Sequence, residues 1–319
     1  MKLSLGEPPG AEIRADRLRI RLIAWEAMAR RGWILFLAMG LIWGIPYLLI
    51  KVAVGELNPV TLVFFRTALG ALLLLPLAAA RNGLRPLLPR WKFVLAYTLV
   101  EVALPWVLLS DAERHLTSSL TGLLIAAVPF VGVILSWLTG AADRFDARRL
   151  AGLIIGFLGV GALVGLDVSG SDLTAIGELG LVAIGYAVGP MIIARRLSDV
   201  PGMGVVAVSL TLPAVAYSPF ALSHLPGKMP SVQVLLAIAV LGVICTALAF
   251  LVFFALIAEV GSVRATMITY VNPAVALALG VALLHEPFTF GAALGFVLIL
   301  AGLFLATRRP RRALELSRA

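Results

Sequence analysis

Two charged side chains lie inside long apolar stretches of the chain, where a charge is costly. Glu101 lies in the stretch YTLVEVALPW, about nine residues from either end of a span predicted over 93–110. A glutamate is too short to reach the membrane surface from there, so its carboxyl is expected to face a partner or a water-filled cavity. Such a carboxyl can carry a coupling proton or bind a substrate amine. The alternative is a protonated or paired carboxyl that only helps the helices to pack.

Arg66 is the second of these charges and lies about seven residues from the outer end of a span predicted over 59–80. At about 1.5 Å per residue its depth is close to that of Glu101. An ion pair between Arg66 and Glu101 is therefore one hypothesis, and binding of a substrate carboxylate by the guanidinium is another. A third is that the long side chain reaches the outer surface instead.

Six aromatic side chains inside the predicted spans either line a binding cavity or simply pack: Trp43, Tyr47, Trp106, Tyr186, Phe250 and Tyr270. Three short motifs join an aromatic residue to a helix breaker: Trp43-Gly44-x-Pro46, Pro105-Trp106 and Tyr270-x-Asn272-Pro273. Broken membrane helices expose backbone dipoles, which bind small zwitterions in transporters. The aromatic residues and Asn272 are therefore candidate substrate-binding residues. The predicted kink or hinge residues are Pro46, Pro105, Pro129, Pro190 and Pro273.

The composition places the chain in the membrane class. Hydrophobic residues make up 61% of its 319 residues, charged residues only 13%, and the mean hydropathy is +1.03. The single cysteine, Cys245, excludes a disulfide framework and is expected to be a packing residue. The three histidines show no metal-ligand spacing, so no metal or cofactor is predicted. The basic residues lie in short loops between spans, which argues for a topological role and against nucleic-acid binding.

Ten apolar stretches are long enough to cross a bilayer as helices, and their connections are short. The predicted spans are 33–53, 59–80, 93–110, 117–140, 149–167, 177–194, 202–221, 232–256, 264–284 and 289–307. Of the 26 Lys and Arg residues, 22 fall on the side of the N-terminus and three on the other side. By the positive-inside rule both termini are expected to be cytoplasmic.

The chain contains a doubled pattern. A shift of 144 residues lays Pro129 on Pro273 and Ser118 on Ser262. Five spans per copy is an odd number, so the second copy is expected to cross the membrane in the opposite sense. The predicted architecture is an all-α membrane protein of two five-helix inverted-topology repeats. Its predicted parts are a basic segment 1–32, a first repeat 33–167, a second repeat 176–307 and a basic tail 308–319.

Several short motifs resemble those of the EamA-like transporters of the drug/metabolite transporter superfamily. The first half has Trp43-Gly44, Lys51, Pro59 and Arg66, and the second half has Gly242, Thr246-Ala247-x-Ala249-Phe250, Val260-Gly261, Asn272-Pro273-Ala274-Val275 and His285-Glu286. The second half departs from the first, with Tyr186-Ala187 in place of Trp43-Gly44 and Ser209 in place of Arg66. The resemblance implies ten helices around a central cavity that moves amino acids, amines or other small metabolites, commonly outward.

No catalytic motif is visible in the chain. A Walker A sequence, an H-E-x-x-H helix and a G-x-S-x-G elbow are all missing from it, so neither ATP-driven nor enzymatic chemistry is predicted. A membrane-embedded enzyme would need paired carboxylates or clustered histidines at one depth, whereas Glu101 stands alone. A nucleotide-sugar or lipid-linked translocase of the same superfamily would need a cluster of basic residues, and Arg66 is the one inside a span.

The predicted function is a secondary transporter in the inner membrane that exports amino acids or related amines by alternating access. Its expected partners are a small-molecule substrate and the lipid bilayer, and the chain is expected to be a monomer or a weak dimer. Protons, exchange and downhill flow all stay open as the energy source.

Overall fold

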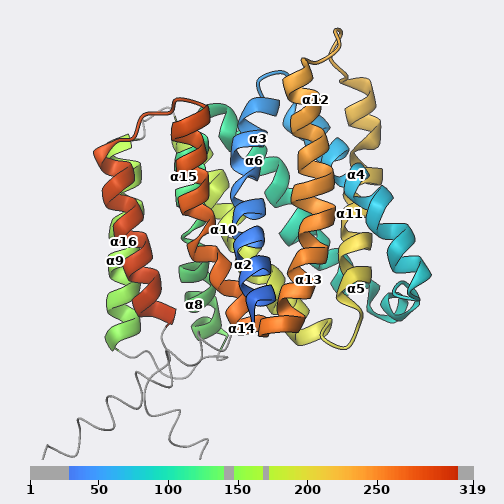
Figure 1. The fold of residues 1–319 in the computed structure, drawn as a ribbon, viewed down its shortest axis with the longest axis horizontal. Helices are drawn as coiled ribbons and strands as arrows, with labels where there is room; N and C mark the ends of the chain where they lie inside the picture. The colour runs from blue at the N-terminus through green and yellow to red at the C-terminus, as the bar shows by residue number, and fades with distance from the viewer. Residues whose placement is uncertain (1–28, 140–146, 168–171, 308–319) are drawn as a thin grey trace, which may run out of the picture.

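The computed structural model describes residues 29–139, 147–167 and 172–307. Most of the predicted basic segment 1–32 and all of the tail 308–319 lie outside these ranges. Within them every regular element is a helix (Figure 1), which confirms the predicted all-α class. In chain order the elements are α2 (Arg30–Gly44), α3 (Pro46–Ala53), α4 (Pro59–Ala80), η1 (Arg85–Arg90), α5 (Trp91–Tyr97), η2 (Thr98–Ala103), α6 (Leu104–His115), α7 (Ser118–Ile125), α8 (Val128–Leu138), α9 (Ala147–Asp167), α10 (Leu173–Arg196), α11 (Gly202–Ser223), α12 (Val232–Ala239), η4 (Val240–Leu248), α13 (Ala249–Val260), α14 (Ser262–Ala265), η5 (Thr266–Tyr270), α15 (Asn272–Leu283) and α16 (Phe290–Thr307).

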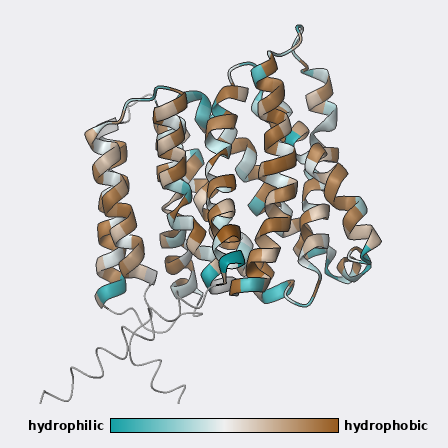
Figure 2. Ribbon diagram, in the orientation of Figure 1, coloured by the Kyte–Doolittle hydropathy of each residue, from teal (hydrophilic) through white to brown (hydrophobic). Residues whose placement is uncertain are grey.

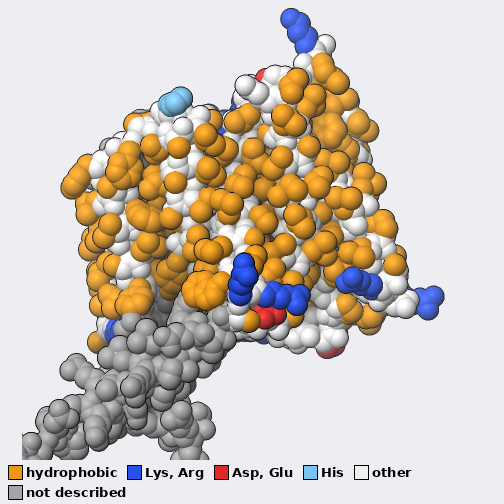
Figure 3. All heavy atoms as spheres, viewed as in Figure 1, with side chains coloured by type: hydrophobic (Ala, Val, Ile, Leu, Met, Phe, Trp, Pro, Cys, Tyr) orange, Lys and Arg blue, Asp and Glu red, His pale blue; other side chains and the backbone are white. Residues whose placement is uncertain are grey.

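Nine helical stretches of the described chain are long and apolar enough to cross a membrane. The tenth predicted span corresponds to α16, which is apolar but shorter within the described residues. Apolar residues cover the middle of the bundle and polar residues gather at its ends (Figure 2). On the face in Figure 3 hydrophobic side chains form a continuous band, with Lys and Arg concentrated along its lower edge. Such a band matches a hydrocarbon layer between two aqueous surfaces.

The third span is longer than the sequence predicted. Helix continues without a loop from Trp91 through η2 to His115, so the boundary predicted at residue 110 is wrong. The acidic and basic residues after residue 110 suggested a loop, but the apolar spacing of Leu109, Ala112 and Leu116 continues the buried face of the helix. Glu113 lies on this same face.

Polar residues begin several of the spans by capping free N–H groups. The side chain of Asn58 accepts a hydrogen bond from Val60 N at 2.9 Å, and Pro59 follows it at the first turn of α4. Thr117 caps α7 through Leu120 N at 3.2 Å. These residues supply acceptors for N–H groups that have no partner inside the helix.

Four of the predicted hinge prolines begin a helical segment after an interruption, whereas one does not. Pro46 follows the break between α2 and α3, Pro105 follows η2, Pro129 follows the break between α7 and α8, and Pro273 follows η5. Pro190 lies inside the uninterrupted helix α10 and is exposed on its surface.

The interruptions recur at matching places in the two halves. Both η2 and η4 are π-helical, and a shift of 144 residues lays η2 inside η4. The break at Ala126 and Ala127 falls by the same shift on the end of η5. π-Helical turns inside longer helices often mark functional sites. The two halves therefore share the π-helical segment of the third span and the break of the fourth, whereas the break between α2 and α3 falls by the same shift on the uninterrupted helix α10.

Glycines allow the closest helix pair, α9 with α16, to approach to backbone contact at one edge of the bundle (Figure 1). A Cβ atom added at Gly302 would lie 2.5 Å from Gly156 N and 2.6 Å from Gly152 O. These are backbone atoms, which cannot move aside as a flexible side chain can. A stripe of small residues of this kind is how membrane helices pack without side chains between them.

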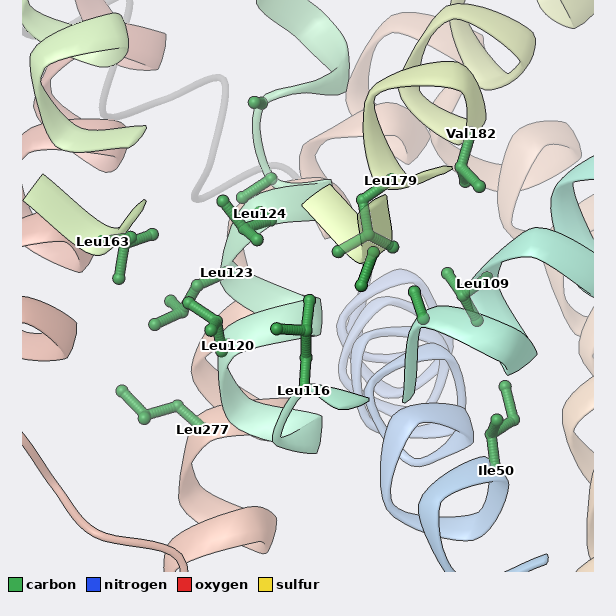
Figure 4. Packing of buried hydrophobic residues seen from close by; sticks show 14 of the residues in the cluster. Ile50, Leu109, Leu116, Leu120, Leu123, Leu124, Leu163, Leu179, Val182 and Leu277 are labelled. Atoms are coloured by element: carbon green, nitrogen blue, oxygen red, sulfur yellow. The ribbon is translucent and has the colours of Figure 1, made fainter. Parts of the chain in front are cut away.

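The core between the two halves is built mainly from leucine. Figure 4 shows Leu120, Leu123 and Leu124 from α7 beside Leu163 from α9 and Leu277 from α15, and all of them are buried. On the other side of the bundle α4 packs against α11, and its Gly70 lies against Thr246 of η4. These contacts fix α4 and η4, which carry parts of the candidate site.

Glu286 joins the two halves at one end of the bundle. Its carboxylate accepts hydrogen bonds from Ser118 N at 2.7 Å, from Ser119 N at 2.9 Å and from the Ser119 hydroxyl. His285 adopts a positive φ of 54° after the end of α15, and Pro287 prevents the helix from continuing. The turn thereby places an acceptor at the N-terminus of α7, where the free N–H groups and the helix dipole favour a negative charge.

Replacing Glu286 by alanine is expected to lower the free energy of unfolding by about 2 kcal/mol, since hydrogen bonds to a charged group are lost and α7 donors are left unpaired. Ser119→Ala, which removes one donor, should cost less. The assay is thermal unfolding with a thiol-reactive dye, whose only target is the buried Cys245. Ser223→Ala, at an exposed serine, serves as the control. If Glu286→Ala and the control unfold at the same temperature, the hydrogen bonds between Glu286 and the N-terminus of α7 do not contribute to stability.

Candidate functional site

Arg66 lies buried in the bundle, with its guanidinium against an aromatic ring. Its side chain donates from Nε to Thr246 Oγ1 at 3.0 Å, and its Cζ lies 3.7 Å from the centroid of the Trp106 ring. Only 8% of the residue is exposed, so it does not extend to the outer surface. A guanidinium over an indole ring is stabilised by the ring quadrupole and keeps N–H donors for a further partner.

The surroundings of Arg66 come from both halves of the chain. Tyr47, Tyr186 and Glu113 are close enough to interact electrostatically with the guanidinium, together with Cys245. Trp106 lies on α6 and Thr246 on η4, so one π-helical segment supplies a direct partner of Arg66. The structure thus gathers four of the predicted site residues, Arg66, Trp106, Tyr47 and Tyr186, into one group, which we call the Arg66 cluster.

Glu101 points away from Arg66, and the ion pair considered from the sequence is not formed. Its carboxylate lies against Gly189 of α10, where an added Cβ atom would overlap it, and its Oε2 has no hydrogen-bond partner. Similar predicted depth suggested the pair, but the third span continues to His115, so Glu101 lies fourteen residues from its outer end while Arg66 lies seven residues from Pro59. Depth also leaves open the direction of a side chain around the helix axis. The π-helical turn η2 carries Glu101 toward α10 instead.

The other predicted site residues have their own partners, although Phe250 packs against the same hydrophobic cluster that contains Trp106. Trp43 packs against Phe253 at 4.8 Å and Phe250 at 6.0 Å between ring centroids. Tyr270 turns toward α16, where its hydroxyl lies 3.4 Å from Leu303 O. Asn272 is oriented so that its amide donates to Gly40 O at 3.1 Å and Ile268 O at 3.0 Å. It thereby satisfies carbonyl groups beside the break before α15.

Sequence reasoning missed Glu113, the most deeply buried carboxylate of the described chain. Glu113 is fully buried, and neither of its carboxylate oxygens has a hydrogen-bond partner. The ammonium of Lys51 lies nearby but donates to backbone carbonyls, to Glu113 O at 2.6 Å and to Leu116 O at 2.8 Å. The periodic spacing with Leu109 and Leu116 was the available signal, because it places Glu113 on the buried face of a continuing helix.

The described residues offer no group of three or more His, Cys, Asp or Glu side chains arranged to hold a metal ion. Two surface grooves of the described bundle are apolar. One, of about 980 Å³, lies along α9 and α16, and the other lies between α15 and α16. Neither includes a residue of the Arg66 cluster.

A family model described as the EamA-like transporter family matches this chain twice, over residues 30–165 and 176–308. The chain belongs to this family. It is a multi-pass transporter of the inner membrane, and the Arg66 cluster is built from residues of both matched regions.

Relatives of this EamA-like transporter match it over most of their length. An uncharacterized transporter, YvbV, of Bacillus subtilis is 26% identical over 85% of this chain and 90% of its own. A probable amino-acid metabolite efflux pump of Salmonella typhimurium is 24% identical over 87% and 95%. The uncharacterized inner membrane transporter YedA of Escherichia coli K12 is 28% identical over 77% and 80%.

A solved crystal structure also matches, with a TM-score of 0.63 and 20% sequence identity. The match covers 88% of this chain and 98% of that one. At this identity the likeness establishes the helical fold of the bundle and nothing about the substrate.

Proposed function

We propose that this EamA-like transporter exports amino acids or related amines by alternating access around the Arg66 cluster. The observation that carries the proposal is the buried guanidinium of Arg66, stacked on Trp106 and with no carboxylate within ion-pair distance among the described residues. Burying a charge costs free energy unless the charge is paired. Because the direct partners of the Arg66 guanidinium are neutral, an anionic ligand can offset this cost by pairing with it. A substrate carboxylate is such a ligand.

An inverted repeat with ten spans is the architecture on which this mechanism rests. The first span of each half packs on the third span of the other, since α2 and α3 contact α13 and α12 while α10 contacts α6. The second, fourth and fifth spans each pack on their own counterparts, α4 on α11, α7 on α15 and α9 on α16. This exchange of partners is what a two-fold relation between the halves predicts, and transporters place their sites at such an interface.

A cytoplasmic position for both termini accords with the fold. The described chain begins with α2 and ends with α16 on the same side of the bundle (Figure 1). The predicted excess of Lys and Arg lies on this side. We propose that the basic segment 1–32 and the tail 308–319 flank the two repeats there, and that the chain acts as a monomer or weak dimer.

The chemistry of the cluster favours a small zwitterion. Arg66 supplies donors for a carboxylate, and the rings of Trp106, Tyr47 and Tyr186 supply apolar walls. Two buried carboxylates interact electrostatically with the cluster, Glu113 with Arg66 and Glu101 with Tyr186. The name of the Salmonella relative, a probable amino-acid metabolite efflux pump, supports the same substrate class and the export direction. The substrate pathway beside the helix breaks is proposed to be shaped by four further residues, Trp43, Phe250, Tyr270 and Asn272. The proposed hinges are the five prolines Pro46, Pro105, Pro129, Pro190 and Pro273.

Glu101 is proposed as the carboxyl that exchanges a proton near the middle of the membrane. It lies on a π-helical turn, against a glycine of α10, with an oxygen that no protein donor reaches. A carboxyl in this setting can bind and release a proton without breaking a structural hydrogen bond.

The test is uptake of a panel of labelled amino acids and amines into proteoliposomes, with and without a pH gradient, for wild type and Glu101→Gln. We expect wild-type transport of amino acids to follow the gradient and Glu101→Gln to lose that dependence while still exchanging substrate. Gradient-dependent transport that survives in Glu101→Gln would reduce this residue to a structural role. If no panel member moves but nucleotide sugars or lipid-linked substrates do, the translocase alternative replaces the amino-acid proposal.

A further inference from the structure

We propose that Glu113 binds the ammonium group of the substrate and that protons from the outer side compete for the same carboxylate. The inference rests on the proposed transport function and adds a residue that neither the family match nor the sequence motifs assign. It divides substrate recognition into two points, with Arg66 for the carboxylate and Glu113 for the amine.

The first step of the argument is the absence of any donor for Glu113. Its side chain is completely buried near the end of α6, yet neither oxygen is hydrogen-bonded. Buried carboxylates that serve only structure are normally paired or hydrogen-bonded. Glu113 is therefore left open for a cation that the described protein does not itself supply.

The second step is that the nearest protein cation is occupied elsewhere. Lys51 contributes its ammonium to the carbonyls of Glu113 and Leu116, at the C-terminal end of α6. There it neutralises acceptors that have no partner inside the helix. Lys51 thus fixes the end of α6 over the Glu113 side chain without forming hydrogen bonds to the carboxylate.

The third step is the charge around Glu113. The groups that interact electrostatically with it are Lys51, Arg66, Glu286 and Tyr47. Glu286 is a like charge engaged by the N-terminus of α7, and it raises the affinity of this region for a cation. Arg66 interacts with Glu113 but is not among the groups that influence Glu101. Of these two buried carboxylates, Glu113 is the one that interacts with Arg66 itself, whereas Glu101 interacts with Tyr186 of the cluster.

The two points together explain how a zwitterion can be exchanged for a proton. The substrate carboxylate lies at Arg66 and its ammonium at Glu113, so the bound pair adds no net charge. When the substrate leaves, the Glu113 carboxylate takes up one proton from the outer water and Arg66 loses its carboxylate partner, so the empty protonated site carries one more positive charge than the loaded site. A low outer pH should therefore favour release of the substrate on that side.

The first experiment needs no substrate. Infrared spectra of the purified protein in bilayers are recorded between pH 5 and pH 9, and the C=O stretch of protonated carboxyl groups is followed. We expect Glu113→Gln to lose a pH-dependent part of this band. The control is Glu56→Gln, at an exposed outer-loop carboxyl whose pKa is lowered by hydrogen bonds from Ser231, and it should keep this part. A band in Glu113→Gln identical to that of wild type would overturn the proposal.

The second experiment uses L-leucine as the probe, in counterflow between proteoliposomes and an outer buffer at pH 6 or pH 8. We expect Glu113→Gln to slow leucine counterflow about ten-fold or more and to abolish the difference between the two pH values, with partial rescue by Glu113→Asp. Inhibition by 4-methylpentanoate, which has the carboxylate and side chain of leucine but no ammonium, should be unchanged. An unchanged KM for leucine and an unchanged pH response in Glu113→Gln would contradict the proposal.

Failure of the two proposals can be told apart. If the infrared band depends on Glu113 but wild type moves neither leucine nor any other amino acid, then Glu113 binds protons while the substrate class is wrong. If wild type exchanges amino acids and Glu113→Gln does so with the same pH response, the transport function stands and the role of Glu113 falls. Unfolding followed through Cys245 shows that each variant is folded.

Discussion

Arg66→Ala is expected to reduce amino-acid transport in proteoliposomes by about 100-fold. Charge-assisted hydrogen bonds to a substrate carboxylate contribute about 1.5–3 kcal/mol, and 1.4 kcal/mol corresponds to a factor of ten. Arg66→Lys should rescue little, because an ammonium lacks the planar fork that stacks on Trp106 while donating to Thr246. The measurement is the initial rate of uptake of the best-transported panel amino acid.

The matched control for this change is Arg114→Ala. Arg114 lies at the end of α6, is exposed and pairs with Asp111 at 3.1 Å. Surface ion pairs of this kind contribute little, so transport should stay near the wild-type rate. Transport by Arg66→Ala at the rate of Arg114→Ala would show that the guanidinium does not bind the substrate. The proposed site would then have to be moved away from the cluster.

Gly302→Val is expected to cause the largest loss of stability, about 3 kcal/mol or more. Its added carbon atoms would meet backbone atoms of Gly152 and Gly156, so α9 and α16 must separate or shift. Overpacking of a close-packed contact typically costs about 1–3 kcal/mol, and here no flexible side chain can yield. Thermal unfolding followed by labelling of Cys245 should show a large decrease in the unfolding temperature.

Gly161→Ala provides the control on the same helix α9. A Cβ atom at Gly161 meets nothing within 4 Å, because this position faces outward from the α9 and α16 seam. Alanine is also the better helix former, so stability should be unchanged or slightly increased. Equal unfolding temperatures for Gly302→Val and Gly161→Ala would mean that the two helices can separate at little cost. The packing of α16 would then contribute little to stability.

The sequence alone determined most of the helical spans and several of their breaks, although it ended the third span too early and predicted a kink at Pro190 inside the uninterrupted helix α10. Runs of apolar residues must be helical in a bilayer, since their backbone groups have no other partners there. Proline lacks an N–H donor, so Pro46, Pro129 and Pro273 predicted the starts of helical segments after interruptions. The shift of 144 residues anticipated the irregular segments that the two halves share, and the motifs indicated the EamA-like family before any fold was known.

The sequence also located two charges inside the membrane, but it did not determine what they face. Position along a helix gives depth at about 1.5 Å per residue, and it leaves open which neighbour lies opposite each side chain. The sequence placed Arg66 and Glu101 at similar depths, whereas the third span continues to His115, so Glu101 lies deeper, and the two side chains contact different helices. Tyr270 and Asn272 occur in a motif that suggested binding, whereas the tertiary structure directs both toward backbone carbonyls.

Only the tertiary structure brought Arg66, Trp106 and Thr246 together, because they lie on three spans from two halves of the chain. Only the tertiary structure buried Glu113, which appears in the sequence as part of the polar end of a span. Lys51 of α3, which holds the end of α6 through the carbonyls of Glu113 and Leu116, and Glu286, which interacts electrostatically with Glu113, are both distant along the chain. Hydropathy fixes how a chain crosses the membrane, while the packing of helices decides which polar groups meet at its centre.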